Sequence, residues 1–384
     1  MYDRVIRSAR TTYSDLPLAR SASTLEVPIR YNSLFVVCAV LAAAPLSAQT
    51  STTKASTVYR APGPGERHLS NIRQLTFGGS NAEAYFSADG KRLIFQRKAS
   101  PDPGVGCDQQ YIMNVDGSDM HRVSNGEGRT TCGYFIDGDR RIVYSSTFAY
   151  DPACPPPPPD SLGYIWPLSH LEIYSAKPDG SDLRPLTHNG AYNAEATASP
   201  DGKRLIFTST KDGDIDLYTM NIDGSDVRRI TNRLGYDGGA YFSPDGRKIV
   251  WRAAYPVTRA DTVQYRQLLA MDMVRPFALE IWIANADGSD AHQVTHLGGA
   301  NWAPFFFPDG KRIVFASNYE NPMSGNFDLY AINTDGTGLE KITTYKDFDG
   351  FPMFSPDGRK LVFVSARGGK GPGEINIFIA DWKD

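Results

Sequence analysis

The stretch "YFSPDGRKIVW", from Tyr241 to Trp251, places two apolar runs on either side of a Pro-Asp-Gly tip. Runs of aromatic and β-branched residues favour β-strands. Asp-Gly between such runs favours a tight turn, because glycine accepts a positive φ without Cβ strain. The stretch therefore predicts a β-hairpin. Near copies of it stand at 85–95, 134–144, 197–207, 305–315 and 353–363, so the hairpin is predicted six times.

A second phrase follows these hairpins, as in "LYTMNIDGSDVRRIT" at 217–231. It reads as a strand, an Asp-Gly turn and a further strand, so one unit consists of four antiparallel strands, A to D. The second residue of each copy marks the unit, and the markers are spaced 49, 63, 44, 64 and 48 residues apart: Phe86, Phe135, Ala198, Phe242, Phe306 and Phe354. These spacings are typical of propeller blades, two of which carry insertions.

The two ends of the chain predict how the ring closes. The sixth unit stops after its third strand, "INIFIAD" at 375–381, and an orphan phrase "NIRQLT" at 71–76 matches a fourth strand. If the N-terminal strand completes the last blade, no long edge stays unpaired. The predicted fold is an all-β, six-bladed propeller of four-stranded antiparallel blades, closed in this way and carrying a short helical insertion in blade four.

The "FSPDG(K/R)(K/R)" and "(A/I)DGS" motifs resemble the WD40-like PD40 repeats of the TolB-like propeller family, over residues 68–382. The resemblance implies the six-bladed fold. TolB carries an α/β domain ahead of its propeller. Only about twenty residues separate the cleavage site predicted below from the orphan strand here. We therefore expect that domain to be absent, and TolB's role in envelope maintenance is not carried over to this chain.

The first residues predict export. Residues 34–44, "LFVVCAVLAAA", follow Arg30 and precede "PLSA", the pattern of a secretory signal peptide. The apolar run is shorter than the roughly 20 residues of a membrane span. We expect a signal peptide with a long leader at 1–48, cleavage near Ala48, a linker at 49–67 and the propeller at 68–384. The predicted location is the periplasm or the exterior, with no integral membrane segment.

Three cysteines follow that cleavage site: Cys107, Cys132 and Cys154. An oxidising compartment favours a disulfide, and an odd number leaves one thiol. Cys132 begins the A strand of blade two, and the other two lie in B–C loops on the same face. We predict that Cys132 pairs with Cys107 or with Cys154. No histidine stands at metal-ligand spacing from them, so no metal site is predicted there.

The tight A–B and C–D turns share one face of the ring, and all the long loops lie between strands B and C on the other. Binding sites usually lie on such loops. One long loop, at 150–170, holds a five-proline run. It is read either as a rigid cover pinned by Tyr164 and Trp166 or as a ligand wall. The other, at 256–277, switches to helical periodicity, and we expect a short helix over blade four.

The helix is predicted to begin at a cap, Thr258 or Asp261, and to end before Pro276. Its expected buried face carries these residues: Val263, Gln267, Leu268 and Met271. A structural role, burying apolar surface, is weighed against gating of the channel.

Short polar residues stand five places before every marker: Asn81, Thr130, Asn193, Asp237, Asn301 and Asp349. Three places before it come Glu83, Cys132 and Glu195, and Trp302 adjoins Asn301. Because strand A is innermost, these positions predict a polar, partly anionic collar at the channel mouth. It would bind a basic peptide, a polyol or Ca²⁺, which takes oxygen ligands. The alternative is local, because Asn and Asp suit turn geometry. Apart from Ca²⁺, no cofactor is predicted.

The composition, 41% hydrophobic and 22% charged with a net charge of −3, is that of a soluble globular protein and shows no basic excess for nucleic acid. No Gly-x-Ser-x-Gly nucleophile elbow occurs. The sequence therefore predicts an exported, monomeric, non-enzymatic binding or scaffold propeller for a protein, peptide or glycan partner. The alternative is a propeller enzyme, a metal-dependent lyase or hydrolase acting on carbohydrate or peptide.

Overall fold

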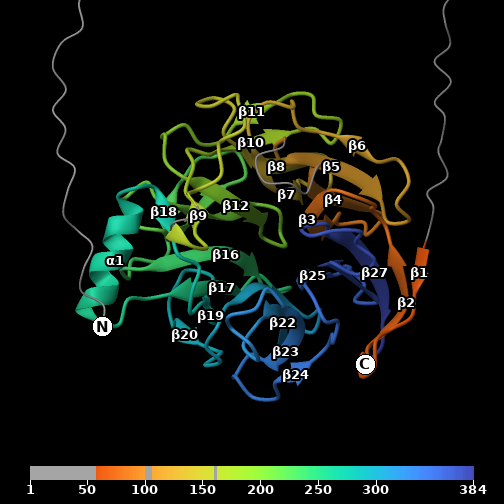
Figure 1. Cartoon of the computed structure of the whole chain (residues 1–384). Helices are drawn as coiled ribbons and strands as arrows, with labels where there is room; N and C mark the ends of the chain where they lie inside the picture. The colour runs from red at the N-terminus through yellow and green to blue at the C-terminus, as the bar shows by residue number, and fades with distance from the viewer. Residues whose placement is uncertain (1–57, 100–105, 160–161) are drawn as a thin grey trace, which may run out of the picture. The chain divides into compact units, whose positions relative to one another are not determined.

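The computed structural model describes residues 58–99, 106–159 and 162–384. The predicted leader, with its cleavage site, lies outside the described residues. The described residues form a six-bladed β-propeller around a central channel (Figure 1). None of the helices in these three ranges is long and apolar enough to cross a membrane.

Each blade is an antiparallel sheet whose strands follow one another from the channel outward. Blade one consists of β3 (Ser80–Phe86), β4 (Arg92–Lys98), β5 (Gln109–Asn114) and β6 (His121–Arg122). Blade two consists of β7 (Thr130–Ile136), β8 (Arg141–Ser146), β10 (Glu172–Ala176) and β11 (Arg184–Pro185). Blade three consists of β12 (Asn193–Ala198), β13 (Arg204–Ser209), β14 (Asp216–Asn221) and β15 (Arg228–Arg229).

The remaining blades repeat this order. Blade four consists of β16 (Tyr236–Phe242), β17 (Lys248–Ala254), β19 (Glu280–Asn285) and β20 (His292–Gln293). Blade five consists of β21 (Asn301–Phe306), β22 (Arg312–Ser317), β23 (Asp328–Asn333) and β24 (Glu340–Lys341). Blade six contains β25 (Asp349–Phe354), β26 (Lys360–Ser365), β27 (Asn376–Trp382), β2 (Leu69–Gln74) and β1 (Val58–Arg60).

The repeated Pro-Asp-Gly phrase is the A–B hairpin of each blade. In blade four, Phe242 pairs with Ile249, and the Ser243 amide donates to the Lys248 carbonyl at 2.9 Å. The Asp245 carboxylate accepts the Ser243 hydroxyl at 2.6 Å, and Gly246 takes a φ of +70°. The local chemistry of the turn thus builds the hairpin, as the sequence predicts.

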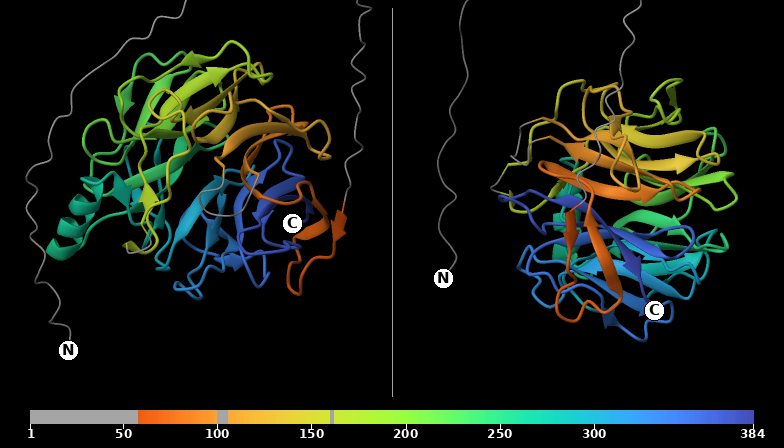
Figure 2. Two further views of the ribbon diagram at one scale, coloured as in Figure 1. Left: turned by 45° about the horizontal axis from the view of Figure 1, so that its top comes forward. Right: turned by 90° about the vertical axis from the view of Figure 1, so that its right-hand side faces the viewer.

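The predicted closure of the ring is confirmed. β2 pairs antiparallel with β27, and both views in Figure 2 show the N-terminal strands beside the C-terminal strand. The prediction that 49–67 is entirely a linker is wrong from residue 58 onward. β1 adds a fifth strand to blade six, and Glu66 is buried, where its carboxylate pairs with Arg367. The N-terminal segment pairs with the last blade because that blade has no fourth strand from the C-terminal part of the chain.

The helical insertion is confirmed as α1 (Arg259–Leu269), with Thr258 at its N-cap in a capping box with Asp261. The predicted buried face is wrong in part. Val263 and Met271 are about half exposed, and Leu268 is buried. The helix faces the protein with Tyr265 as well, whose hydroxyl donates to the Asp214 carboxylate at 2.5 Å. A tyrosine whose hydroxyl meets a buried carboxylate fixes the rotation of the helix.

The two long insertions meet each other. β9 (Trp166–Pro167), from the blade-two insertion, pairs antiparallel with β18 (Met273–Val274), which follows α1 in the blade-four insertion. The Leu168 amide donates to the Asp272 carbonyl at 2.7 Å. Figure 1 shows this two-stranded ribbon beside α1. We call β9 and β18 the roof ribbon.

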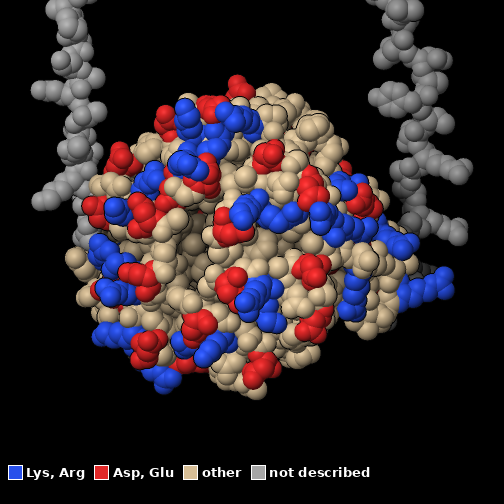
Figure 3. All heavy atoms as spheres, turned by 180° about the vertical axis from the view of Figure 1, so that it is seen from behind, with Lys and Arg blue, Asp and Glu red and all other residues tan. Residues whose placement is uncertain are grey.

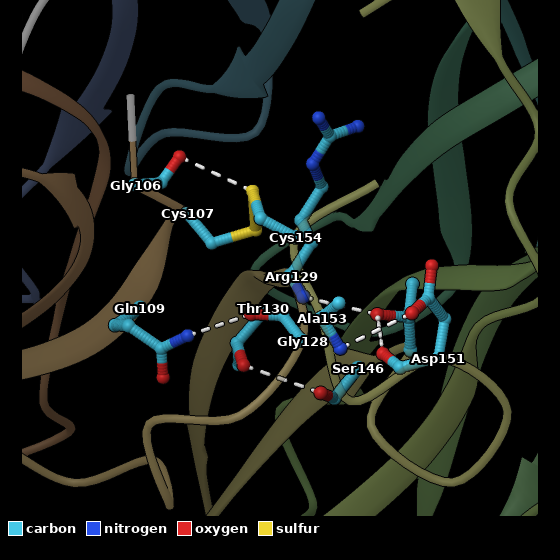
Figure 4. Close-up of a disulfide and its surroundings, with 11 residues drawn as sticks. Gly106, Cys107, Gln109, Gly128, Arg129, Thr130, Ser146, Asp151, Ala153 and Cys154 are labelled. Atoms are coloured by element: carbon cyan, nitrogen blue, oxygen red, sulfur yellow. Dashed lines mark hydrogen bonds between the residues drawn. A yellow bond between two sulfur atoms is a disulfide. The ribbon is translucent and has the colours of Figure 1, made fainter. Parts of the chain in front are cut away.

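The disulfide joins Cys107 to Cys154, with Cα atoms 5.4 Å apart (Figure 4). The prediction that Cys132 takes part in the bond is wrong: its thiol is free and buried. Cys107 and Cys154 lie in neighbouring B–C loops, and the Cys154 sulfur is 3.1 Å from the Gly106 carbonyl. The side chain of Cys132 instead lines a cavity in the channel.

Candidate functional site

The six residues five places before the markers lie at the junctions between blades. All six are fully buried: Asn81, Thr130, Asn193, Asp237, Asn301 and Asp349. The backbone amide of each residue donates to a carbonyl in the preceding blade, in the segment that leads into strand C of that blade. For example, the Asn193 amide donates to the Leu171 carbonyl at 3.1 Å. The Asn193 side chain donates to the same carbonyl at 3.0 Å. The prediction that these six side chains line the channel mouth is therefore wrong, because the six residues are buried between adjacent blades and hydrogen-bond one blade to the next. We call them the stitch positions.

A β-bulge follows each stitch and turns the chain toward the channel. The register between strands A and B shifts at this point, for example between Ala194 and Thr197 in blade three. The bulged residues all have φ between 50° and 62°: Glu83, Cys132, Glu195, Gly239, Ala303 and Phe351. For residues with a Cβ this conformation costs about 1 kcal/mol or more. A repeated bulge of this kind re-aims one side chain per blade.

All six bulge residues line one cavity of about 330 Å³ at the loop-bearing end of the channel, which we call the cup. Two predicted residues, Glu83 and Glu195, and the free thiol of Cys132 are among them. Trp302, also predicted, forms part of the wall. The bulges on one side of the ring thus supply acids and a thiol, and those on the other side supply a glycine and two apolar residues.

The floor of the cup is aromatic. The rings of Tyr85 and Tyr241 lie 5.9 Å apart between centroids, and Tyr241 also meets Phe305 at 5.3 Å. Tyr241 lines both the cup and a second recess on the turn-bearing face. The buried rings therefore separate the two recesses, and a ligand in the cup meets a closed end.

Arg252 is the largest feature that the sequence analysis missed. It extends from β17 into the cup, where its guanidinium forms an ion pair with Glu195 and donates to the Tyr236 hydroxyl at 2.7 Å. Thr208 donates to the other carboxylate oxygen of Glu195 at 2.8 Å. Both Glu195 and Arg252 are thus held in one geometry. A comparison of the repeats could have singled out Arg252. At the equivalent position of strand B the other five blades carry uncharged residues: Gln96, Ser145, Thr208, Ala316 and Val364.

Gly239 makes the room that Arg252 occupies. A Cβ at residue 239 would lie 1.8 Å from Nη1 of Arg252. The φ of Gly239, +62°, is also one that glycine adopts without cost. The second glycine in "YDGGAYF" is therefore a requirement of the cup as well as of the backbone.

The acids of the cup are not equivalent. Burial, reinforced by the nearby Glu195, raises the pKa of Glu83 to about 7, and it has no ion-pair partner among the described residues. Burial and the same two glutamates raise the pKa of the Cys132 thiol, which keeps it protonated at neutral pH. Burial also raises the pKa of Asp108, against the opposing charge of Arg129. Glu83 is thus the acid whose charge changes near neutral pH.

The roof ribbon covers the cup with aromatic surface. Trp166 lies 6.1 Å from Trp302 and 6.0 Å from Tyr236 between ring centroids, and the Arg252 guanidinium lies 5.4 Å from the Trp166 ring. Tyr164, by contrast, is 72% exposed at the rim. Of the two readings of the 150–170 insertion, Trp166 fits both, because it is packed against the propeller and faces the cup.

The turn-bearing face is different in character. Figure 3 shows Lys and Arg mixed with Asp and Glu around a central hollow, with neither sign dominating. The hollow there is lined by the hairpin tips, among them Pro200, Pro244 and Pro356. Several charges at the tips pair locally, as Lys203 does with Asp201. Isolated exposed pairs of this kind contribute little energy and give no common direction to a ligand.

No group of three or more His, Cys, Asp or Glu side chains in the described ranges is arranged to hold a metal ion. The acidic arc of the cup offers Glu83 and Glu195, and Glu195 is already engaged by Arg252. A Ca²⁺ site takes six to eight oxygen ligands as a rule. The expectation that Ca²⁺ binds at the channel mouth stays a prediction.

The repeats match a known family model, that of the TolB β-propeller domain, over residues 168–260 and 266–378, more than half of the chain. The chain belongs to the TolB β-propeller family. No curated protein sequence matches this TolB-family propeller significantly.

Solved structures share its fold at low identity. TolB from Acinetobacter baumannii is 18% identical, with a TM-score of 0.51 over 79% of this chain and 64% of that one. An oligogalacturonate lyase from Vibrio parahaemolyticus is 14% identical, with a TM-score of 0.51 over 86% and 98%. A gluconolactonase from Xanthomonas campestris is 12% identical, with a TM-score of 0.55 over 86% and 96%. The fold is thus shared by a TolB and by enzymes, and it does not decide between binding and catalysis.

Proposed function

We propose that this TolB-family propeller is an exported, non-enzymatic binding protein that holds a protein or peptide partner on its loop-bearing face, with a basic side chain of the partner in the cup. The observation that carries the proposal is Glu83, an acid without an ion-pair partner among the described residues, in an aromatic cup closed at its floor. The leader pattern at 34–48 supports export.

The shape and charge of the cup favour a lysine or arginine side chain. A long aliphatic stem would pack on Trp166 and Trp302, and the charged head would reach Glu83. Charge-assisted hydrogen bonds contribute about 1.5–3 kcal/mol each. Glu195 cannot serve equally well, because Arg252 and Thr208 already occupy both of its oxygens.

The test replaces Glu83 by glutamine and measures capture of partners from an envelope extract by the immobilised chain. We expect Glu83→Gln to weaken capture about tenfold or more, the equivalent of one lost charge-assisted bond. We also expect capture by the natural chain to strengthen as pH rises through about 7, because Glu83 then becomes ionised. The variant should lose this pH dependence.

Glu127→Gln is the matched control, since Glu127 is exposed in the turn between β6 and β7 and is not among the residues that line the cup. A second pair of variants tests the geometry. Gly239→Ala should displace Arg252 from Glu195 and change capture, whereas Gly202→Ala, with a φ of +70° and open space around it, should not. If all four variants capture partners equally well, the cup is not the site. The same conclusion follows if neither the variants nor the natural chain capture any partner.

The second candidate is a propeller enzyme acting on carbohydrate. One observation favours it: Glu83, protonated below about pH 7, lies in the same cavity as the ion-paired Glu195, and catalytic sites often hold two acids in different environments. Turnover of a panel of oligosaccharides that disappears in Glu83→Gln, with folding retained, would favour this candidate. Absence of turnover across the panel would leave the binding function.

A further inference from the structure

Another recess, of about 740 Å³ and distinct from the one on the turn-bearing face, lies next to the cup, and we call it the groove. Trp166 and Trp302 line both cavities and form the wall between them. One side of the groove is the segment that follows the roof ribbon, Arg275–Phe277, and the other is the B–C loop of blade five, between β22 and β23. The groove therefore belongs to the insertions of this chain.

The groove is apolar over most of its surface. Phe327 and Phe348 pack against Trp302, with ring centroids 5.6 Å and 6.1 Å away. At the rim, Phe277 is 55% exposed and Met323 is 88% exposed. Large apolar side chains left in water around one recess are typical of an interaction site. The open rim leaves room for a ligand that extends beyond the groove.

Among the described residues that line the groove, Arg275 has the one charged side chain. Its Nη2 donates to the Leu162 carbonyl at 3.0 Å, which fixes the guanidinium. Within the described residues Arg275 has no carboxylate partner, and its Nε is buried without a hydrogen bond. A half-buried cation against aromatic surface favours an anionic group on a ligand, and the planar guanidinium matches the geometry of a carboxylate.

We propose that the groove binds the C-terminal residue of a peptide whose last side chain is large and apolar. The carboxylate would pair with Arg275, and the side chain would lie on Phe327, Phe348 and Trp302. The positive charge of Arg275 favours an anionic group, and the aromatic walls favour an apolar side chain. The open rim lets the rest of the peptide extend out of the groove. This site is separate from the cup, and its occupation does not depend on Glu83.

The test uses a pentapeptide ending in Leu-Phe with a free carboxylate, the same peptide with a C-terminal amide, and N-acetyl-phenylalanine. Binding is followed by calorimetry and by the fluorescence of the tryptophans. We expect the acid to bind about tenfold or more tightly than the amide, as one charge-assisted contact implies. Arg275→Gln should remove this difference, and Arg266→Gln, on the exposed side of α1, should keep it.

Three outcomes would overturn the proposal: equal binding of acid and amide, an unchanged preference in Arg275→Gln, or no saturable binding of either peptide. If N-acetyl-phenylalanine binds as tightly as the peptide acid, the occupant is a small apolar acid and the peptide assignment is wrong. Glu83→Gln separates the two sites. It should leave peptide binding in the groove intact, whether or not it affects capture by the cup.

Discussion

At the scale of residues, the stitch position and the bulge position lie two residues apart in strand A, but their side chains lie in different environments. In a regular strand they would share a face, because side chains alternate. The left-handed residue of the bulge breaks this alternation, so Asn193 is buried between blades while Glu195 enters the cup. Substitutions at the stitch positions should therefore change stability, and substitutions at the bulge positions should change the lining of the cup.

Asp237 provides the residue-scale prediction. It is fully buried, accepts hydrogen bonds from Trp251 at 2.7 Å and Tyr255 at 2.6 Å through one oxygen, and leaves the other oxygen unpaired. Burial raises its pKa to about 7. The unfolded chain releases this proton near pH 4, so folding stability falls as pH rises from about 4 to about 7.

Asp237→Asn should remove this loss, since Asn stands at the equivalent position in three other blades. We expect a gain in unfolding free energy on the order of 2–4 kcal/mol at about pH 8, shrinking toward zero near pH 4. Urea unfolding at several pH values measures it. A gain of equal size at all pH values, or a loss at about pH 8, would contradict the assignment.

At the scale of elements, the insertions complete a site whose lining begins with the blade strands. The roof ribbon joins two loops about one hundred residues apart in sequence, and the disulfide joins a third. Figure 4 shows Arg129, a residue of the cup wall, beside Cys154. The disulfide therefore holds the loops on the acidic side of the cup together.

Replacing Cys107 and Cys154 together by serine should lower the unfolding free energy. The bond spans 47 residues, for which the chain-entropy model gives about 4 kcal/mol, and we expect a loss of about 2–4 kcal/mol. In the natural chain unfolded without reductant, alkylation should label Cys132 alone of the three cysteines. Labelling of Cys107 or Cys154 under these conditions would contradict the pairing.

At the scale of the whole molecule, the ring is held by its N-terminal segment. Leu69 and Ile72 of β2 are buried in the core of blade six, and the Glu66 carboxylate meets Arg367, which also pairs with Asp349. Without β2, strand β27 would expose an unpaired edge. Closure thus couples the first described residues to the last blade.

Two shortened chains test this closure. A chain beginning at Ala61 lacks only β1, the outermost strand, and should unfold within a few degrees of one beginning at Gln49. A chain beginning at Phe77 lacks β2 as well and should lose about 5 kcal/mol or more, because three buried aliphatic side chains and a buried ion pair are removed. Thermal unfolding and light scattering measure both. Equal stability of the two chains would contradict the closure.

The sequence by itself determined the hairpins, the number of blades, the closing strand and the start of the helix. These depend on local signals, such as the Pro-Asp-Gly tip at 244–246 and the Thr258 cap, which act over a few residues. It also placed Glu83, Glu195 and Trp302 near the channel mouth. Only the tertiary structure decided that Asn193 and Asp237 are buried, that Cys107 pairs with Cys154, and that Arg252 enters the cup. The reason is physical: a bulge changes which face a residue occupies, and contacts between distant loops depend on how the blades bring them together.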